Sequence, residues 1–193
     1  MIFTWFFRTV CHTEISGTEN MPSEGGVILA ANHLSNWDPP FLGTFILRPV
    51  SYMAKKELFD IPVFSRCIVH LHAFPVKRGA ADRGAIKAAL TALGQGRCVG
   101  LFPEGTRSRD GDVHKAEAGV ALLAAKSGVP VVPAAITGTN RIFSRGSFFP
   151  NLYVSYGEPL FFEGRANDRA ALEEFSKKIM EEIVKMKKKH SKE

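Results

Sequence analysis

The stretch that decides the fold covers residues 26–42 and reads Gly-Val-Ile-Leu-Ala-Ala-Asn-His-Leu-Ser-Asn-Trp-Asp-Pro-Pro-Phe-Leu. Its apolar run, residues 27–31, predicts a buried strand. Pro39 and Pro40 predict a helix start, because Pro is tolerated in the first turn of a helix. The residues between these two elements therefore form a tight strand-to-helix connection. In an open α/β sheet, ligands bind at such connections, beyond the carboxyl ends of the strands.

Two residues of this connection, His33 and Asp38, can meet across the loop. An Asp that accepts a hydrogen bond from one ring nitrogen of a His fixes the tautomer and leaves the other nitrogen free to take a proton. The pair therefore predicts a catalytic dyad. The alternative interpretation is that Asp38 only caps the helix, because Asp is favoured at the N-cap and Pro39 follows it. A carboxylate has two oxygens, so Asp38 can serve both purposes.

Hydrophobic patterning divides the rest of the chain into alternating strands and helices. Pro133 falls inside an apolar strand and predicts a bulge or an edge position, because Pro cannot donate in a strand ladder. The alternation predicts one α/β domain over residues 1–193, with a mainly parallel, mixed central sheet flanked by helices. The expected strands are 27–31, 50–54, 67–76, 97–102, 129–136 and 151–156; the expected helices are 39–47, 83–93, 116–127 and a C-terminal helix within 168–193, with a short helical or irregular stretch at 55–66 and a loop at 13–26.

The carboxyl ends of parallel strands meet at one edge of a sheet, so the loops that follow three of the predicted strands converge there. The first loop carries His33 and Asp38, the second carries Arg78, and the third is the segment 104–107. We therefore expect the active site at this edge, with one general base and a rim of groups that bind an anion.

The Glu-Gly-Thr-Arg segment of the third loop supplies several groups suited to an anionic substrate. Gly105 permits a tight turn. Thr106 offers a hydroxyl, Arg107 a planar fork for phosphate oxygens, and Glu104 an acceptor. The alternative interpretation is a turn with solvated charges, in which Arg107 pairs with Glu104 or Asp110 and only shapes the loop.

The net charge of the chain indicates which kinds of partner it can bind. With 25 Lys and Arg against 19 Asp and Glu, the net charge of +6 suits phosphate, an acidic membrane or nucleic acid. A nucleic-acid site would place its cations in a stripe with interleaved aromatic residues. Arg78 and Arg107 instead lie in loops that point at the dyad. We therefore expect no nucleic-acid partner.

The three cysteines, Cys11, Cys67 and Cys98, are scattered along the chain. Their spacing disfavours a disulfide framework or a zinc site and fits a reducing compartment. The sequence also lacks a metal-ligand cluster, a dinucleotide loop and a Gly-x-Ser-x-Gly nucleophile motif. We therefore expect no metal, no cofactor and no covalent acyl-enzyme.

Residues 1–12 are rich in Phe and Trp but too short to span a bilayer, which takes about 20 apolar residues. They also lack the charged leader and cleavage site of a signal peptide. Two interpretations stay open: the aromatic side chains insert into a membrane interface, or they pack on the core of the domain. We expect a peripheral or monotopic protein on the cytoplasmic side of a membrane, without a spanning helix.

Four motifs occur in order along the chain: Asn32-His33-x4-Asp38, Phe74-Pro75-Val76-x-Arg78, Phe102-Pro103-Glu104-Gly105-Thr106-Arg107-Ser108 and Val131-Val132-Pro133. Together they resemble the glycerolipid acyltransferase family, and most of all its lysophosphatidate (1-acylglycerol-3-phosphate) acyltransferases. The resemblance implies transfer of an acyl chain from acyl-CoA or acyl-carrier protein to the free hydroxyl of lysophosphatidate, which makes phosphatidate for phospholipid synthesis. The alternatives are another acceptor, such as glycerol-3-phosphate or another lysophospholipid, and a non-catalytic relative that binds membrane lipid.

The resemblance also implies a role for each matching residue. His33 would be the general base, and Asp38 would orient it. The implied partners are lysophosphatidate, an acyl thioester, a membrane surface and acyl-carrier protein, with no cofactor and no metal. Substrate binding is implied for Asn32, Arg78, Glu104, Gly105, Thr106 and Arg107.

Overall fold

A mixed, mainly parallel sheet forms the centre of the molecule, as the sequence predicts. The computed structural model describes residues 2–70, 73–76, 83–108, 119–144 and 149–190. Within these residues the sheet has seven strands in the order β1-β7-β6-β2-β5-β3-β4. Neighbouring strands are parallel except β6 and β7, which are antiparallel. The strands are β1 (Thr13–Ser16), β2 (Val27–Ala31), β3 (Val50–Lys55), β4 (Phe74–Val76), β5 (Cys98–Leu101), β6 (Val131–Thr137) and β7 (Leu152–Tyr156).

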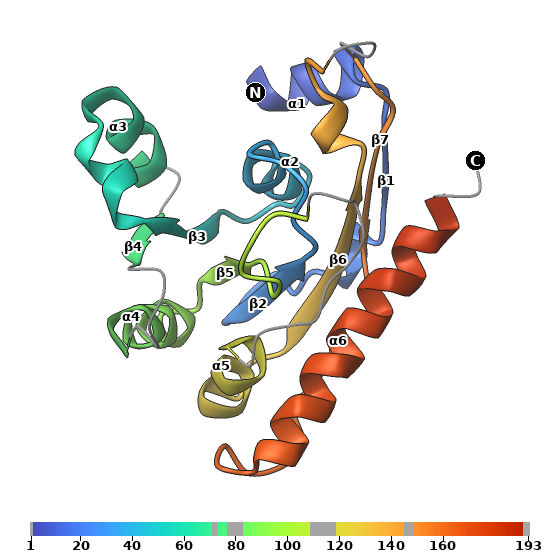
Figure 1. Ribbon diagram of the computed structural model, residues 1–193. Helices are drawn as coiled ribbons and strands as arrows, with labels where there is room; N and C mark the ends of the chain where they lie inside the picture. Colours follow the sequence, from blue (N-terminus) through green and yellow to red (C-terminus); the bar gives the residue numbers. More distant parts are fainter. Residues whose placement is uncertain (1, 71–72, 77–82, 109–118, 145–148, 191–193) are drawn as a thin grey trace.

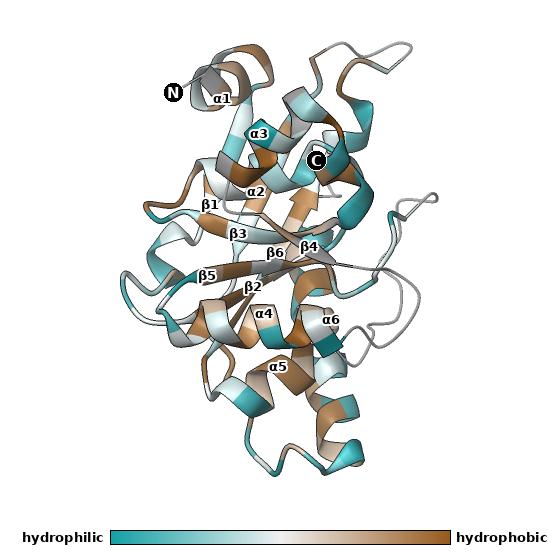
Figure 2. Ribbon diagram, turned by 90° about the vertical axis from the view of Figure 1, so that its left-hand side faces the viewer, coloured by the Kyte–Doolittle hydropathy of each residue, from teal (hydrophilic) through white to brown (hydrophobic). Residues whose placement is uncertain are grey.

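Helices cover both faces of the sheet (Figure 1 and Figure 2). α4, α5 and α6 lie against one face, whereas α2 and the N-terminal α1 lie on the other side. Among the described helices, none is both long enough and apolar enough to cross a membrane. The α-helices are α1 (Ile2–Trp5), α2 (Asp38–Thr44), α3 (Pro62–His70), α4 (Arg83–Gly94), α5 (Gly119–Ser127) and α6 (Arg169–His190), and shorter helical turns cover Phe6–Val10, Thr18–Asn20, Lys56–Asp60 and Thr139–Arg141.

β2 contributes to the core on both faces of the sheet. All five of its residues are buried, and β5 and β6 flank it on either side. Ile28 and Ala30 belong to the core under α4, α5 and α6, while Leu29 and Ala31 belong to the core under α2. Burying a Leu or Ile side chain contributes roughly 1.5–3 kcal/mol. The strand therefore holds the loop that follows it, residues 32–37, on a rigid base.

The strand predicted over residues 67–76 is mostly wrong. α3 continues to His70, and of the described residues in this range only Phe74–Val76 form a strand. β4 pairs in parallel with β3, and a parallel neighbour requires a crossover that usually contains a helix. Pro62 stands at the first position of α3, where its fixed φ favours a helix. The crossover therefore prevails over the β-propensity of the residues that end α3.

The loop predicted over residues 13–26 is also partly wrong, because it contains β1. This short strand pairs in parallel with β7 at the edge of the sheet, with Ile15 opposite Val154. Its burial alternates between half-buried and exposed. One apolar residue, Ile15, among Thr, Glu and Ser is too weak a pattern to identify a strand from the sequence.

Pro133 lies in an internal strand, so its predicted edge position is wrong, but the predicted bulge is present in the neighbouring chain segment. Ala134 of β6 pairs with Tyr156 of β7, whereas Val131 pairs with Leu160. The partner segment thus contains one extra residue between these two pairs. The ladder is interrupted where Pro133 has no N–H to donate.

The remaining predicted elements are confirmed with small shifts at their ends. Five predicted strands are present: the ranges 27–31, 50–54, 97–102, 129–136 and 151–156 correspond, in this order, to β2, β3, β5, β6 and β7. α2 ends at Thr44 instead of near Leu47, and the described part of the predicted helix 116–127 is α5. At the start of α6, Asp168 Oδ1 accepts a hydrogen bond from the Ala171 N–H at 3.1 Å, which caps the helix.

The N-terminal segment is attached to the domain by Phe7. This side chain is fully buried and contacts the Phe41 ring of α2, with the ring centroids 5.0 Å apart. The core-packing interpretation is therefore confirmed for Phe7. Phe3 and Trp5 remain 42% and 64% exposed.

Candidate active site

His33 and Asp38 form a hydrogen-bonded pair where β2 leads into α2. His33 Nδ1 lies 2.7 Å from Asp38 Oδ2. The side chain of Asp38 is fully buried, while that of His33 is 11% exposed. A carboxylate only accepts, so Nδ1 carries the proton and donates it. Nε2 then remains an acceptor, and it has no hydrogen-bond partner among the described residues.

The carboxylate of Asp38 is surrounded by donors. Oδ2 also accepts the backbone N–H groups of Leu34 and Ser35, at 2.6 and 2.7 Å. Oδ1 accepts the hydroxyl of Thr139 at 2.5 Å. These bonds compensate for burial of the charge. The two N–H groups precede the helix, and Trp37 occupies the N-cap position, so the N-cap interpretation of Asp38 is wrong.

The loop after β5 holds the backbone of His33 from both sides. The His33 N–H donates to Glu104 Oε1 at 3.1 Å, and the His33 carbonyl accepts from the Ser108 N–H at 2.8 Å. Gly105 has φ +67° and donates its N–H to the Phe102 carbonyl, which closes a tight turn. Glu104 is buried, and the hydrogen bond to its Oε1 ties the dyad loop to the loop after β5.

Aromatic rings support the imidazole of His33. Its ring stacks on Phe102 with centroids 4.1 Å apart and planes inclined by 17°. Phe102 stacks in turn on Tyr52 of β3 at 6.2 Å and 10°. Burial raises the pKa of Tyr52 well above its usual value, so its phenol stays neutral. The stack and the hydrogen bond to Asp38 together define the orientation of the imidazole.

Asn32 faces the neighbouring strand and not the expected substrate. Its amide Nδ2 donates to the Ile136 carbonyl at 3.0 Å, and its Oδ1 accepts from the Ile136 N–H at 2.8 Å. The side chain is 1% exposed. Both polar ends of the side chain are thus engaged with β6, which anchors the start of the dyad loop.

Thr106 and Arg107 are exposed beside the dyad loop. Arg107 Nη1 donates to Asn36 Oδ1 at 3.3 Å. The described part of the structure contains no ion pair between Arg107 and Glu104, and Glu104 Oε1 accepts from the backbone of His33. Arg78 and Asp110, which the sequence also implicates, lie outside the described residues.

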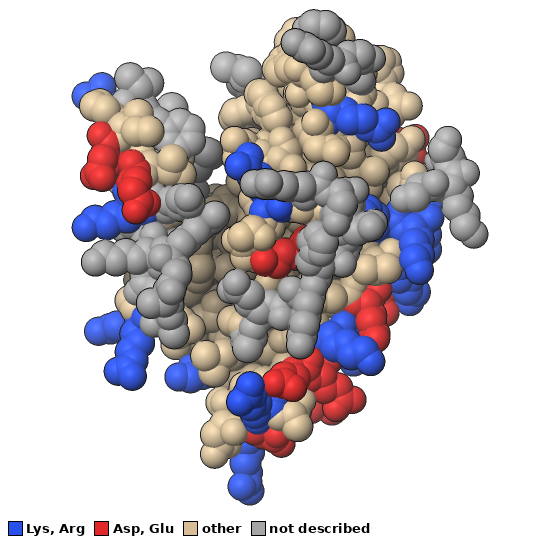
Figure 3. Space-filling view, in the orientation of Figure 1, with Lys and Arg blue, Asp and Glu red and all other residues tan. Residues whose placement is uncertain are grey.

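The described charged side chains are scattered over the face of the molecule that Figure 3 shows. Figure 3 shows the described Lys and Arg side chains on several separate parts of this face, with Asp and Glu between them. Within the described part of the chain, no group of His, Cys, Asp and Glu could hold a metal ion.

The cysteines whose side chains are described have no nucleophilic character. Cys11 and Cys98 are both fully buried. Burial raises the pKa of Cys98 to about 12, although Arg48 partly offsets this. The thiol is therefore protonated at neutral pH, and the interpretation of these cysteines as small buried hydrophobic residues holds.

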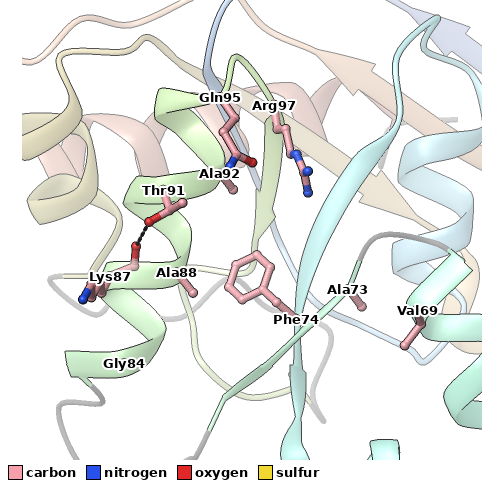
Figure 4. Close-up of a pocket in the computed structure, with 10 residues that line it drawn as sticks. All are labelled: Val69, Ala73, Phe74, Gly84, Lys87, Ala88, Thr91, Ala92, Gln95 and Arg97. Atoms are coloured by element: carbon pink, nitrogen blue, oxygen red, sulfur yellow. Dashed lines mark hydrogen bonds between the residues drawn. The ribbon is translucent and has the colours of Figure 1, made fainter.

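A separate open groove of about 540 Å³ lies between the end of α3, β4 and α4 (Figure 4). The Phe74 ring points towards α4, and Arg97 and Gln95 stand at one end of the groove. None of the described residues that line this groove belongs to the dyad or to the described part of the loop after β5.

Thr139, whose hydroxyl contacts the dyad, is not part of the four motifs. It follows β6, whose carboxyl end lies next to that of β2. The convergence rule that identified the other three loops also applies to this fourth one. Gly138-Thr139, shortly after the predicted strand 129–136, was therefore a signal available in the sequence.

Comparison with known proteins agrees with the geometry. The acyltransferase family model matches residues 12–137. The chain is 36% identical over 152 residues to a 1-acyl-sn-glycerol-3-phosphate acyltransferase of Bacillus subtilis, covering 76% of this chain and 73% of that protein. A protein of the same name from Borreliella burgdorferi is 32% identical over 138 residues, which is 70% of this chain but only 55% of that relative. The crystal structure of the 1-acyl-sn-glycerophosphate (LPA) acyltransferase PlsC from Thermotoga maritima superposes with a TM-score of 0.74 at 29% identity, over 96% of this chain and 75% of the other.

Proposed function

The chain belongs to the acyltransferase family, and on this premise we propose that it is an O-acyltransferase that acylates the free hydroxyl of lysophosphatidate. The observation that carries the proposal is the dyad: Asp38 is fully buried, and His33 keeps Nε2 available at the edge of the sheet. The relatives named above supply the acceptor, since their names specify 1-acylglycerol-3-phosphate.

In the proposed reaction, His33 Nε2 takes the proton of the acceptor hydroxyl while the hydroxyl oxygen attacks the thioester carbonyl. The new C–O bond forms, the C–S bond breaks, and the proton passes from His33 to the departing thiolate. Asp38 stabilises the imidazolium that exists between these two proton transfers. A thiolate is a good leaving group, so the reaction requires no nucleophilic side chain and no metal.

We assign the acceptor phosphate to Arg107, together with Thr106 and Arg78. The hydrogen bond to Asn36 uses one Nη1–H of Arg107, and a guanidinium has five N–H donors in total. The side chain is exposed, so its other donors can reach a bound anion. The contact with Asn36 keeps the cation beside the dyad loop.

The acceptor site also has to reach a membrane lipid, so we propose a peripheral membrane contact. Phe3 and Trp5 are exposed, and so are Phe143 and Phe149 of the segment after β6. Trp37, which precedes Asp38, lies 5.8 Å from the Phe143 ring. The exposed rings therefore continue up to the dyad loop, and the basic end of α6 adds positive charge.

The direct test is an acyl-transfer assay with the purified protein and lipid acceptors in mixed micelles. We expect thiol release from acyl-CoA or acyl-carrier protein that depends on lysophosphatidate, with phosphatidate as the product. Glycerol-3-phosphate and lysophosphatidylcholine serve as competing acceptors, and the two thioesters, assayed side by side, identify the donor. Binding of lysophosphatidate without product from either donor would support the non-catalytic alternative.

A further inference from the structure

We propose that Thr139 is a positioning residue for catalysis: its hydroxyl holds the carboxylate of Asp38 in the orientation that His33 requires. The proposal rests on the function proposed above and extends the dyad to a hydrogen-bonded series of three side chains. Thr139 lies outside the four sequence motifs and beyond residue 137, where the family-model match ends.

The fold delivers Thr139 to the dyad through β6. β6 pairs in parallel with β2, with Ala134 opposite Ala31, so the segments that follow the two strands emerge side by side. Gly138 has φ +91°, which turns the chain sharply after β6. Thr139 then begins a 3-10 turn and is fully buried.

The hydroxyl of Thr139 has a specific role in the hydrogen bonding of Asp38. Oδ2 accepts from His33 Nδ1 and from the backbone N–H groups of Leu34 and Ser35. Oδ1 accepts from Thr139 Oγ1, which is its one partner within the described residues. Each carboxylate oxygen is thus bound to a different part of the fold, and rotation of the carboxylate about its Cβ–Cγ bond is opposed.

Loss of this hydroxyl leaves Oδ1 buried without a donor among the described residues. A buried anion with an unsatisfied oxygen is destabilised, and only the bonds to Oδ2 then oppose rotation of the carboxylate. The imidazolium formed during acyl transfer then loses stabilisation, whereas substrate binding is unaffected. The effect should therefore appear in kcat and leave KM nearly unchanged.

Three variants separate positioning from packing. Thr139→Val keeps the volume and removes the hydroxyl, while Thr139→Ser keeps the hydroxyl and removes a methyl group. Thr44→Val is the matched control, because Thr44 Oγ1 donates to the Pro40 carbonyl within α2 and does not contact Asp38. Each variant is assayed for kcat, for KM of both substrates and for its thermal midpoint.

We expect Thr139→Val to lower kcat by about 10- to 100-fold with KM within about twofold, because a hydrogen bond to a charged group is lost. Thr139→Ser should restore most of kcat and yet melt earlier, because of the small cavity. Thr44→Val should keep the kcat of the original chain. Equal loss of kcat in Thr139→Val and Thr139→Ser, or a normal kcat in Thr139→Val, would overturn the proposal.

A second measurement does not depend on activity, so it still tests Thr139 if no acceptor is turned over. The proton on His33 Nδ1 is observed by NMR at low field and assigned by its absence in His33→Ala. We expect its resonance to move or broaden in Thr139→Val and to stay in place in Thr44→Val. An unchanged resonance in Thr139→Val would show that the hydroxyl does not position the dyad.

Discussion

Contacts constrain His33 at the edge of its imidazole ring, at the face of the ring and at its backbone. Asp38 holds Nδ1, Phe102 lies against the ring, and Glu104 and Ser108 hold the two backbone polar groups. A general base held in this way loses little entropy when the substrate arrives. The sequence alone predicted the hydrogen bond to Asp38, because both residues lie in one short loop. The other three contacts come from the loop after β5, and they depend on how two strands pack side by side.

We expect substitutions of His33 or Asp38 to lower kcat steeply while the protein still folds. His33→Ala should lower kcat by about 100- to 10,000-fold, the usual contribution of a general base. Asp38→Asn should lower kcat as well, because an amide can select the wrong tautomer. It should also lower the free energy of unfolding, since a neutral amide oxygen accepts hydrogen bonds more weakly than the carboxylate oxygen to which Leu34, Ser35 and His33 donate. Steady-state kinetics beside urea unfolding measures both effects; near-normal turnover in folded His33→Ala would refute the mechanism.

Arg107 is predicted to act on the acceptor and not on the thioester. Lys has the charge but not the planar fork, so Arg107→Lys should raise the KM for lysophosphatidate and leave the KM for the donor nearly unchanged. Arg107→Ala should lower kcat/KM by about 10- to 150-fold, as expected for a charged hydrogen bond of roughly 1.5–3 kcal/mol. The kinetics are measured by varying each substrate in turn. Asn36→Ala is the control, because it removes only the hydrogen bond of 3.3 Å between Asn36 and Arg107. If only the KM for the thioester donor rises in Arg107→Lys, Arg107 binds the carrier of the thioester and not the acceptor.

At the scale of helices and strands, the sequence predicts well where the hydrophobic pattern is long. β2 and α6 were predicted almost to the residue, because one is wholly apolar and the other has a regular apolar stripe. The prediction failed at β1 and at the junction of α3 and β4. There the local sequence favours one structure weakly, and the decision comes from pairing with β7 and from the crossover to β3. Topology of this kind is not contained in a window of a few residues.

Because of the turn after β6, we expect Gly138→Ala to lower both the free energy of unfolding and kcat. Gly138 has φ +91°, and a Cβ there would lie 2.4 Å from the Asn151 carbonyl oxygen. We expect a loss of about 2–4 kcal/mol in the free energy of unfolding, from strain and from the clash. Because Thr139 follows directly, kcat should also fall. Both quantities are measured by urea unfolding and by the acyl-transfer assay.

Gly128→Ala is the matched control for this turn. Gly128 also has a positive φ, +69°, but a Cβ at this position would meet no atom within 4 Å, and the residue directly follows α5, away from the dyad loop. The substitution should cost about 1 kcal/mol, from backbone strain alone, and leave kcat unchanged. Equal losses at Gly128 and Gly138 would show that the contact with Asn151 has no effect.

At the scale of the whole molecule, the active site and the exposed aromatic rings share one end. Phe6 of the N-terminal segment lies 5.8 Å from the ring of Trp37 in the dyad loop and 6.0 Å from that of Phe143 after β6. Phe149 continues the contact at 6.3 Å from Phe143. Three segments that are distant in the sequence thus form one aromatic surface next to the dyad. An acceptor lipid in a membrane could then reach His33 without leaving the interface.

This arrangement predicts that membrane binding depends on single exposed rings and not on the N-terminal segment as an anchor. Deletion of residues 1–10 would remove the fully buried Phe7, and any loss of binding would then reflect damage to the core. Trp5→Ser and Phe143→Ser replace side chains that are 64% and 52% exposed, so the fold should be retained. Each should weaken binding to anionic vesicles by roughly 10-fold, the effect of removing an aromatic side chain from an apolar environment.

The control for this prediction is Phe161→Ser, a substitution of a ring that is 61% exposed at the opposite edge of the sheet. Its neighbour Leu160 pairs with Val131, the first residue of β6, whereas the dyad lies at the carboxyl ends of the strands. Phe161→Ser should therefore bind vesicles as the original chain does. Raising the salt from 0.1 to 1 M shortens the screening length from about 10 Å to about 3 Å, so it should weaken binding of all variants through their basic residues. Flotation with phosphatidylglycerol vesicles measures the bound fraction; if Phe161→Ser weakens binding as much as Trp5→Ser and Phe143→Ser do, the membrane does not contact the molecule at the end that holds the active site.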